Sequence, residues 1–233
     1  MLERGIHMKI SKLVLPLVSS IFILCSCGGG GGGSSGGSGN TANAVAAGIW
    51  QGTSSSGFTV DLIVLPNNSF ATIFGNSLVN GGLSVVGFDI GSGSISGSTF
   101  TASGMSEFTS AGYVASGNIT ATVTNNSSII GSATYSTGTT STFNLVPLTG
   151  ISYSIPASLT AIAGSWSGTL LGGGTTNVTI NSTTGAIAGL TSGGCSFTGT
   201  ITPSTVNAYT TSIIIGASPC VNPNTTVSGI GVA

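Results

Sequence analysis

Ala47-Gly48-Ile49-Trp50-Gln51-Gly52-Thr53 and Ala163-Gly164-Ser165-Trp166-Ser167-Gly168-Thr169 are two copies of one short pattern in a chain of 233 residues. The second copy follows the first at an offset of 116 residues. Self-similarity at a fixed offset indicates repeated structural units. The sequence therefore predicts two related units, each of which begins with a Gly-x-Trp strand.

The chain after residue 45 consists of short runs rich in Val, Ile, Thr, Phe and Tyr, bounded by Gly, Asn and Ser. Such runs are typical of β-strands, and no stretch keeps the apolar spacing of a helix. In the first unit, residues 45–149, we expect strands at 48–54, 57–65, 70–75, 82–90, 94–103, 112–124, 128–136 and 140–148. Short turns join each strand to the next, and a meander that closes on itself has no edge strands. The predicted fold class is therefore all-β, an eight-stranded up-and-down antiparallel barrel.

A related, shorter β unit is expected at 161–233, after a linker at 150–160. Its predicted strands lie at 164–171, 175–181, 185–190, 194–202, 206–215 and 225–232, which is about two strands fewer than in the first unit. Three explanations fit the pattern equally well. The second barrel is incomplete, its sheet is completed by the first unit, or the gene product is truncated.

The N-terminal segment holds every basic side chain of the protein: Arg4, His7, Lys9 and Lys12. From Met8 onward it has the pattern of a signal peptide, in which two lysines precede an apolar run, 13–24, that is too short for a permanent membrane span. Leu24-Cys25-Ser26-Cys27 then resembles the lipobox of bacterial lipoproteins. This resemblance implies cleavage of the signal peptide 1–26 and attachment of diacylglycerol to Cys27. The alternative is an ordinary signal peptide followed by an ordinary cysteine.

Gly28 is not the Asp that marks inner-membrane retention in that family, so the resemblance implies a lipid-anchored protein of the outer membrane. Residues 27–44 are rich in Gly and Ser and predict a flexible tether between the lipid and the folded units. Display at the periplasmic face and display at the cell surface both remain open. The membrane, reached through the lipid on Cys27, is the first expected partner.

The charge inventory excludes several functions. Beyond Cys27 the chain has no Lys, Arg or His, and its only acidic side chains are Asp61, Asp89 and Glu107. Nucleic acid is not an expected partner, because its binding depends on cations that displace phosphate counterions. Catalytic triads and lysine-based chemistry are excluded in the same way.

A glycosidase needs only two carboxylates, so the three acidic residues are its candidates. We interpret them instead as solvated or edge-protecting charges, with Asp61 within a strand, Asp89 near a strand end and Glu107 in a loop. Their spacing matches no calcium-binding loop. The expectation is a protein that is not an enzyme and that has no cofactor and no metal.

Cys195 and Cys220 are the only cysteines after Cys27. In an exported protein they are expected to form a disulfide. Closing a loop of this length stabilises a fold by roughly 3.5 kcal/mol in the chain-entropy model. Metal binding is the weaker alternative, because two thiols without His or nearby carboxylates make a poor site.

The Gly-x-Trp of each first strand resembles the start of lipocalin-like barrels, in which the Trp packs across one end. We therefore expect Trp50 and Trp166 to plug their units, or else to contact a ligand. The basic residue that packs on this Trp in lipocalins has no counterpart here. Three functions follow as hypotheses: a structural or interaction role with an unidentified protein partner, lipocalin-like binding of a small apolar ligand, and an adhesin-like surface module. The volume of the barrel interior separates the second from the others.

Overall fold

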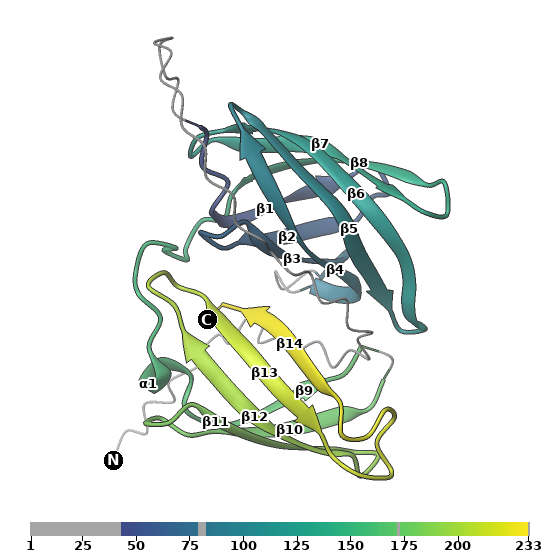
Figure 1. Cartoon of the computed structure of the whole chain (residues 1–233), viewed down its shortest axis with the longest axis vertical. Coiled ribbons are helices and arrows are strands. Elements are labelled where there is room, and N and C mark those ends of the chain that lie inside the picture. Colours follow the sequence, from purple (N-terminus) through teal and green to yellow (C-terminus); the bar gives the residue numbers. More distant parts are fainter. Residues whose placement is uncertain (1–42, 79–82, 172, 233) are drawn as a thin grey trace, which may run out of the picture.

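The chain forms two β units that pack against each other (Figure 1). The computed structural model describes residues 43–78, 83–171 and 173–232. The first unit contains β1 (Gly48–Ser54), β2 (Thr59–Val64), β3 (Ser69–Ser77), β4 (Leu83–Ser96), β5 (Thr99–Thr109), β6 (Gly112–Thr124), β7 (Ser128–Tyr135) and β8 (Thr140–Pro147). The second contains β9 (Gly164–Thr169), β10 (Thr175–Ile180), β11 (Ala186–Thr191), β12 (Ser196–Pro203), β13 (Tyr209–Ile215) and β14 (Thr226–Gly231).

The first unit is a closed antiparallel barrel in which each strand pairs with the next and β8 pairs with β1. This arrangement confirms the predicted fold class. Alternation along β6 shows the reason: every second residue from Ala115 to Val123 faces the barrel interior, while the residues between them are partly or fully exposed. Closure satisfies the backbone hydrogen bonds of both β1 and β8, which would otherwise be edge strands.

The sequence misplaced one turn of the barrel. It predicted a break between strands at 91–93, but β4 continues to Ser96 and the turn lies at Gly97-Ser98, where Gly97 has a φ of +57°. Gly91 and Gly93 are strand residues that leave room for neighbouring rings, and a Cβ on Gly91 would lie 2.8 Å from the Phe70 ring. The glycines therefore signal close packing inside the barrel rather than a turn.

The second unit is one six-stranded sheet in the order β14-β13-β12-β11-β10-β9. Its edge strands β9 and β14 pair with no strand of the barrel, which closes on itself, so strand pairing with the first unit does not complete this sheet. A short helical turn, α1 (Leu159–Ile162), precedes β9 and contributes Ile162 to the apolar core of the sheet. Among the described residues, no helix is long and apolar enough to cross a bilayer.

The two Gly-x-Trp patterns have the same local geometry. The indole Nε1 of Trp50 donates a hydrogen bond to the carbonyl oxygen of Ala46 at 2.9 Å, and that of Trp166 donates to the carbonyl oxygen of Ile162 at 2.7 Å. In each case the acceptor lies four residues before the Trp. Each Trp thus fixes the segment that leads into the first strand of its unit.

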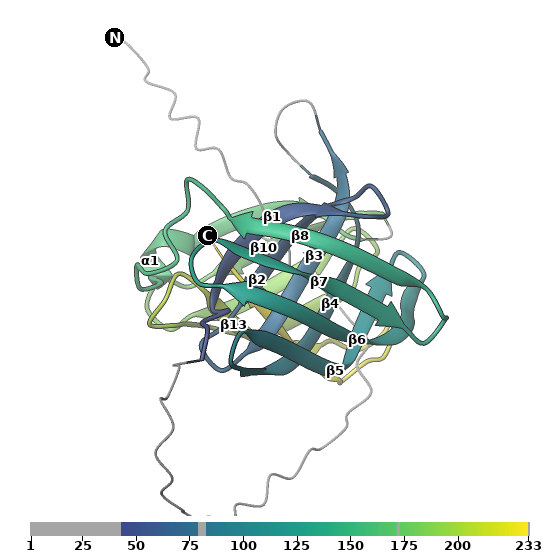
Figure 2. The same cartoon turned by 90° about the horizontal axis from the view of Figure 1, so that it is seen from above.

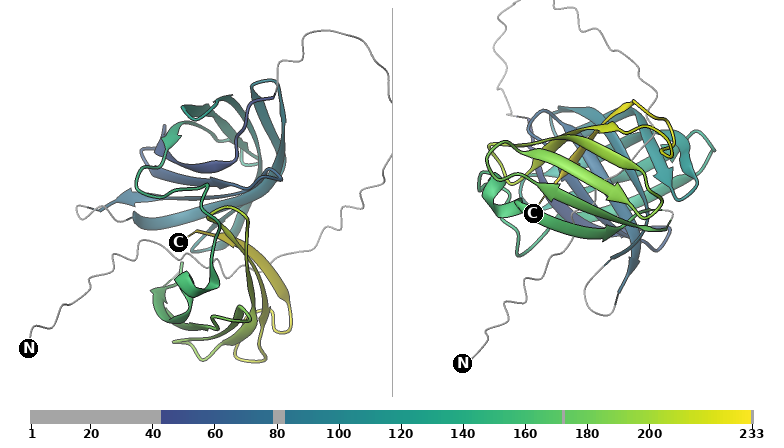
Figure 3. Two further views of the ribbon diagram at one scale, coloured as in Figure 1. Left: turned by 90° about the vertical axis from the view of Figure 1, so that its left-hand side faces the viewer. Right: turned by 90° about the horizontal axis from the view of Figure 1, so that it is seen from below.

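The second unit covers the outer face of β2–β5 (Figures 1 and 3). Ile63 and Leu65 of the barrel pack with Ala208 and with Ile230 of β14. Farther along the same face, Phe88 and its neighbours pack with Leu171, and the Tyr153 hydroxyl donates to the Val64 carbonyl oxygen at 2.7 Å. Strands β6–β8 lie on the side of the barrel away from this contact (Figure 2). The wall of β2–β5 is therefore covered on its outer face around Ile63 and Phe88 as well as on its inner face.

Candidate functional site

One end of the barrel is closed by the chain segment that leads into β1. The backbone N–H of Ala44 donates to the carbonyl oxygen of Gly97 at 2.7 Å, and that of Val45 donates to Oδ1 of Asn125 at 2.7 Å. Gly97 and Asn125 belong to two turns at this end, so residues 43–46 lie across it. Trp50, which is 3% exposed, packs beneath this segment in the barrel core.

The interior beyond this closed end contains a cavity of about 360 Å³. It extends to the opposite end of the barrel, where Ser56, Thr137 and Thr139 lie at its rim in the β1–β2 and β7–β8 turns. Its walls are mainly apolar, and they include Leu62, Phe70, Phe74, Phe100, Ile119 and Leu145. Ligand sites in proteins are commonly concave, apolar and about 300–1,000 Å³ in volume, so this cavity is the candidate site.

A row of polar side chains crosses one wall of the cavity. Thr72 on β3 is directly opposite Asp89 on β4, and Asp89 is directly opposite Glu107 on β5. All three line the cavity. Residues paired in this way have Cβ atoms about 5 Å apart, so the two carboxylates are close neighbours. Tyr135 on β7 completes the cluster, because its hydroxyl donates a hydrogen bond to Oδ2 of Asp89 at 3.5 Å.

Asp89 has incomplete hydrogen bonding within this cluster. It is only 5% exposed, and its Oδ1 is buried without a hydrogen-bond partner. Burial, and next the negative charge of Glu107, raise the pKa of Asp89 from 3.8 to about 7, although the Tyr135 hydroxyl acts in the opposite direction. Burial also raises the pKa of Glu107. Burial in the barrel therefore disfavours the ionised form of both carboxyl groups.

No cation of the described chain can neutralise these carboxylates, because residues 43–233 contain no Lys, Arg or His. Tyr135 carries no compensating charge, and burial followed by the neighbouring carboxylates raises the pKa of its hydroxyl above the ordinary value. Among the described residues, no group of three or more His, Cys, Asp or Glu is placed to hold a metal ion. The cluster thus places two carboxylates in a mainly apolar cavity without a compensating cation from the described residues.

Asp61 is also buried, at 8% exposure, but it does not line the cavity. Its neighbours Val60 and Leu62 face the interior, so Asp61 lies on the outer face of β2, where Gln51 Nε2 donates to its Oδ1 at 2.6 Å. The interpretation of Asp61 and Asp89 as solvated or edge-protecting charges was therefore wrong. The expected loop position of Glu107 and strand-end position of Asp89 were wrong too, because both lie within strands.

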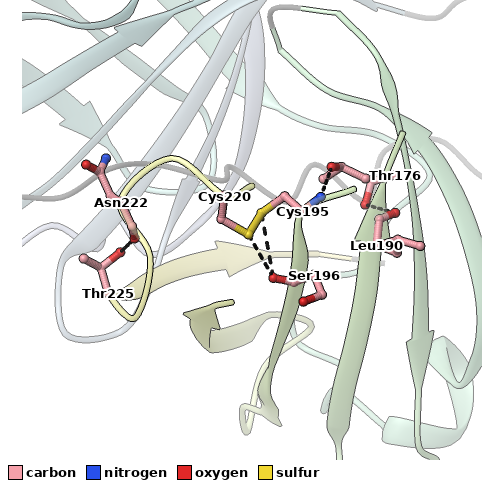
Figure 4. The surroundings of a disulfide bond; sticks show 8 residues. Thr176, Leu190, Cys195, Ser196, Cys220, Asn222 and Thr225 are labelled. Atoms are coloured by element: carbon pink, nitrogen blue, oxygen red, sulfur yellow. Dashed lines mark hydrogen bonds between the residues drawn. A yellow bond between two sulfur atoms is a disulfide. The ribbon is translucent and has the colours of Figure 1, made fainter. Parts of the chain in front are cut away.

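Cys195 and Cys220 form a disulfide, with their Cα atoms 4.6 Å apart (Figure 4). Cys195 lies just before β12, and Cys220 lies in the connection between β13 and β14. Both sulfur atoms lie beside the carbonyl oxygen of Ser196. In the same connection the Thr225 hydroxyl donates to the Asn222 carbonyl oxygen at 2.7 Å. The bond therefore ties a long loop of the second unit to the adjacent strand, away from the barrel cavity.

Trp50 and Trp166 both pack into the cores of their units rather than line the cavity. Trp166 is only partly buried, whereas Trp50 is almost fully buried. The lipobox residues Leu24, Cys25, Ser26 and Cys27 lie outside the described residues.

Sequence reasoning considered Asp89 and Glu107 for catalysis, but it did not bring them together or include Tyr135. The available signal was the glycine spacing of β4. Gly87 and Gly91 face the rings of Phe74 and Phe70 inside the barrel, which places Asp89, midway between them, on the same inner face.

Comparisons with protein families, with curated proteins and with solved structures find no match to this chain.

Proposed function

We propose that the barrel binds a small, mainly apolar ligand in its interior and does so without chemical conversion. The observation that carries this proposal is the cavity of about 360 Å³, walled by apolar side chains and reaching the end of the barrel opposite Trp50. An eight-stranded barrel is just wide enough either to be filled by its own side chains or to hold one small ligand. The unfilled volume inside this barrel favours the second outcome.

A purely structural role accounts less well for this interior. Buried polar groups without partners and unfilled apolar space both lower stability, so a barrel that serves only as a scaffold gains from a filled, neutral core. Here the cavity contains two carboxylates, one of which has an unpaired oxygen. A bound ligand would fill the apolar space and could pair with the carboxylate oxygen.

The proposed setting is the outer membrane, with the protein held by a lipid on Cys27. The support is the order of the N-terminal segment, in which a basic stretch, an apolar run and the Leu24–Cys27 lipobox precede a glycine tether. Cys27→Ala is expected to block processing and membrane partition in cells. Unchanged maturation of this variant would contradict the lipid anchor and would leave the binding proposal intact.

Ligand binding is tested with N-phenyl-1-naphthylamine, a neutral apolar dye that fluoresces strongly when it leaves water. The full chain is expected to enhance its fluorescence in a saturable way. Ser141 lines the cavity on β8, whereas the next residue, Thr142, is exposed on the outer face. Ser141→Trp should therefore weaken dye binding at least about tenfold by filling the cavity, and Thr142→Trp should not. Equal effects of the two variants, or no saturable binding by the natural chain, would overturn the proposal.

A further inference from the structure

We infer that the barrel selects ligands that carry a protonated amine on an apolar body, with the amine bound by Asp89 and Glu107. This inference deepens the proposed binding function and rests on it. It specifies the chemical class of the ligand and the residues that bind its charged group. Three features support it: the position of the two carboxylates, the unpaired oxygen of Asp89 and the absence of basic side chains from residues 43–233.

The first step concerns hydrogen bonding. Buried polar atoms in proteins are nearly always paired, and an unpaired one points to a missing partner. Asp89 lines the cavity together with Thr72 and Glu107, and its Oδ1 is buried without a donor. Tyr135 donates to the other oxygen, Oδ2, and does so at the long distance of 3.5 Å. A ligand with N–H or O–H groups at this point would supply the missing donor.

The second step concerns charge. Two carboxylates side by side in an apolar cavity repel each other, and burial alone disfavours their ionised forms. The groups that face Asp89 are Glu107 and Tyr135, neither of which can become positively charged, and residues 43–233 supply no other cation. A ligand ammonium group compensates both carboxylates and donates up to three hydrogen bonds. A neutral alcohol meets only the hydrogen-bonding requirement, and a fatty acid adds a third negative charge.

The third step concerns shape. The polar row Thr72-Asp89-Glu107 occupies one part of the wall, while the remaining wall is built mainly from Val, Leu, Ile, Ala and Phe side chains. A ligand that matches this surface has one compact charged group and an unbranched or ringed apolar remainder. Hydrogen bonds between charged groups are roughly twice as strong as neutral ones, so the ammonium group decides selectivity and the apolar part adds affinity.

The test compares octylamine, octanol and octanoate, which share an alkyl chain and differ in the head group. Their binding to the purified full chain is measured by displacement of N-phenyl-1-naphthylamine at pH 8, where an alkylamine is still protonated. We expect octylamine to bind at least about tenfold more tightly than octanol, and octanoate to bind more weakly than octanol. The preference for octylamine should shrink at pH 5.5, where Asp89 holds a proton.

Asp89→Asn should reduce the preference for octylamine several-fold while the affinity for octanol stays within about twofold. Asp61→Asn is the matched control, since it removes a buried carboxylate on the outer face of the same wall and should leave the preference unchanged. Glu107→Gln gives a second, independent reduction of the preference. Binding of the three probes with equal affinity, or equal effects of Asp89→Asn and Asp61→Asn, would overturn the amine inference and leave the apolar site standing. Failure of the dye itself to bind would instead overturn the proposed function.

Discussion

The two units share their first strand and their Trp contact, yet they differ in closure, charge and reinforcement. The barrel is closed, holds all three acidic side chains of residues 43–233 and encloses a cavity. The second unit is an open sheet, and residues 161–233 hold one tyrosine, Tyr209, and no acidic or basic side chain. Its apolar core is tied by the Cys195–Cys220 disulfide. The barrel interior is partly unfilled, as the proposed ligand binding requires, whereas the second unit packs against the barrel wall from outside.

The largest expected difference between the units is at the paired tryptophans. Trp50→Ala should destabilise the protein by about 3–5 kcal/mol, because it empties a fully buried site and leaves the Ala46 carbonyl oxygen without its donor. Trp166→Ala should cost clearly less, since Trp166 is only partly buried. Urea unfolding of both variants measures this difference. Equal losses would show that the two Trp contacts are energetically equivalent despite their different burial.

The next effect is a pH dependence that belongs to the barrel alone. Between pH 4 and 7 the unfolded chain ionises Asp89 while the folded chain keeps its proton, so stability falls as the pH rises through this window. The loss reaches on the order of 4 kcal/mol above pH 7, and Glu107 adds to it in the same direction. Asp89→Asn should flatten most of this profile in urea unfolding at pH 4 and pH 8. Asp61→Asn serves as the control, and a profile that rises with pH would contradict the burial of Asp89.

Removal of the disulfide should act on the second unit. Cys195→Ser should lower stability by roughly 3.5 kcal/mol in the chain-entropy model, because the loop between the cysteines becomes free in the unfolded chain. Hydrogen exchange should locate the loss in β12–β14 rather than in β6–β8. Dye binding by the barrel should persist under conditions in which the variant is folded. Loss of dye binding from a folded variant would show that the two units depend on each other more closely than this account allows.

The smallest expected effect compares equivalent glycines in β1, which pairs with a strand on each side, and in β9, which is an edge strand. A Cβ on Gly52 would overlap the carbonyl oxygen of Asn144 on β8, whereas a Cβ on Gly168 meets no atom within 4 Å. Gly52→Ala should therefore cost about 1–3 kcal/mol, while Gly168→Ala should be neutral or slightly stabilising. Thermal unfolding compares the two. Similar costs would imply that a strand also packs against β9.

Strand number and order in the barrel followed from the sequence, because turn residues and β-branched runs are local signals. The inward or outward direction of each side chain was readable where one face meets solvent, as along β6. It was not readable in β2, where five consecutive residues from Val60 to Val64 are buried. The second unit covers this wall, so alternation of apolar and polar residues disappears.

The acid cluster was missed for the same reason. A sequence such as Phe88-Asp89-Ile90 suggests that the apolar residues face the core and the acid faces water, but here Phe88 packs on the outer face against the second unit and Asp89 faces the cavity. The turn wrongly placed at 91–93 also shortened the strand and moved Glu107 into a loop. Besides the glycine spacing of β4, the packing of the second unit onto the barrel, a long-range contact, gives the direction of these side chains.

The most direct test of the central claim is a crystal structure of the protein grown with octylamine at pH 8. We expect the alkyl chain in the barrel interior and the nitrogen within hydrogen-bonding distance, about 2.7–3.2 Å, of Oδ1 of Asp89. An interior that holds no octylamine, or an alkyl chain inserted with its nitrogen at the rim beside Ser56 and Thr137, would contradict it.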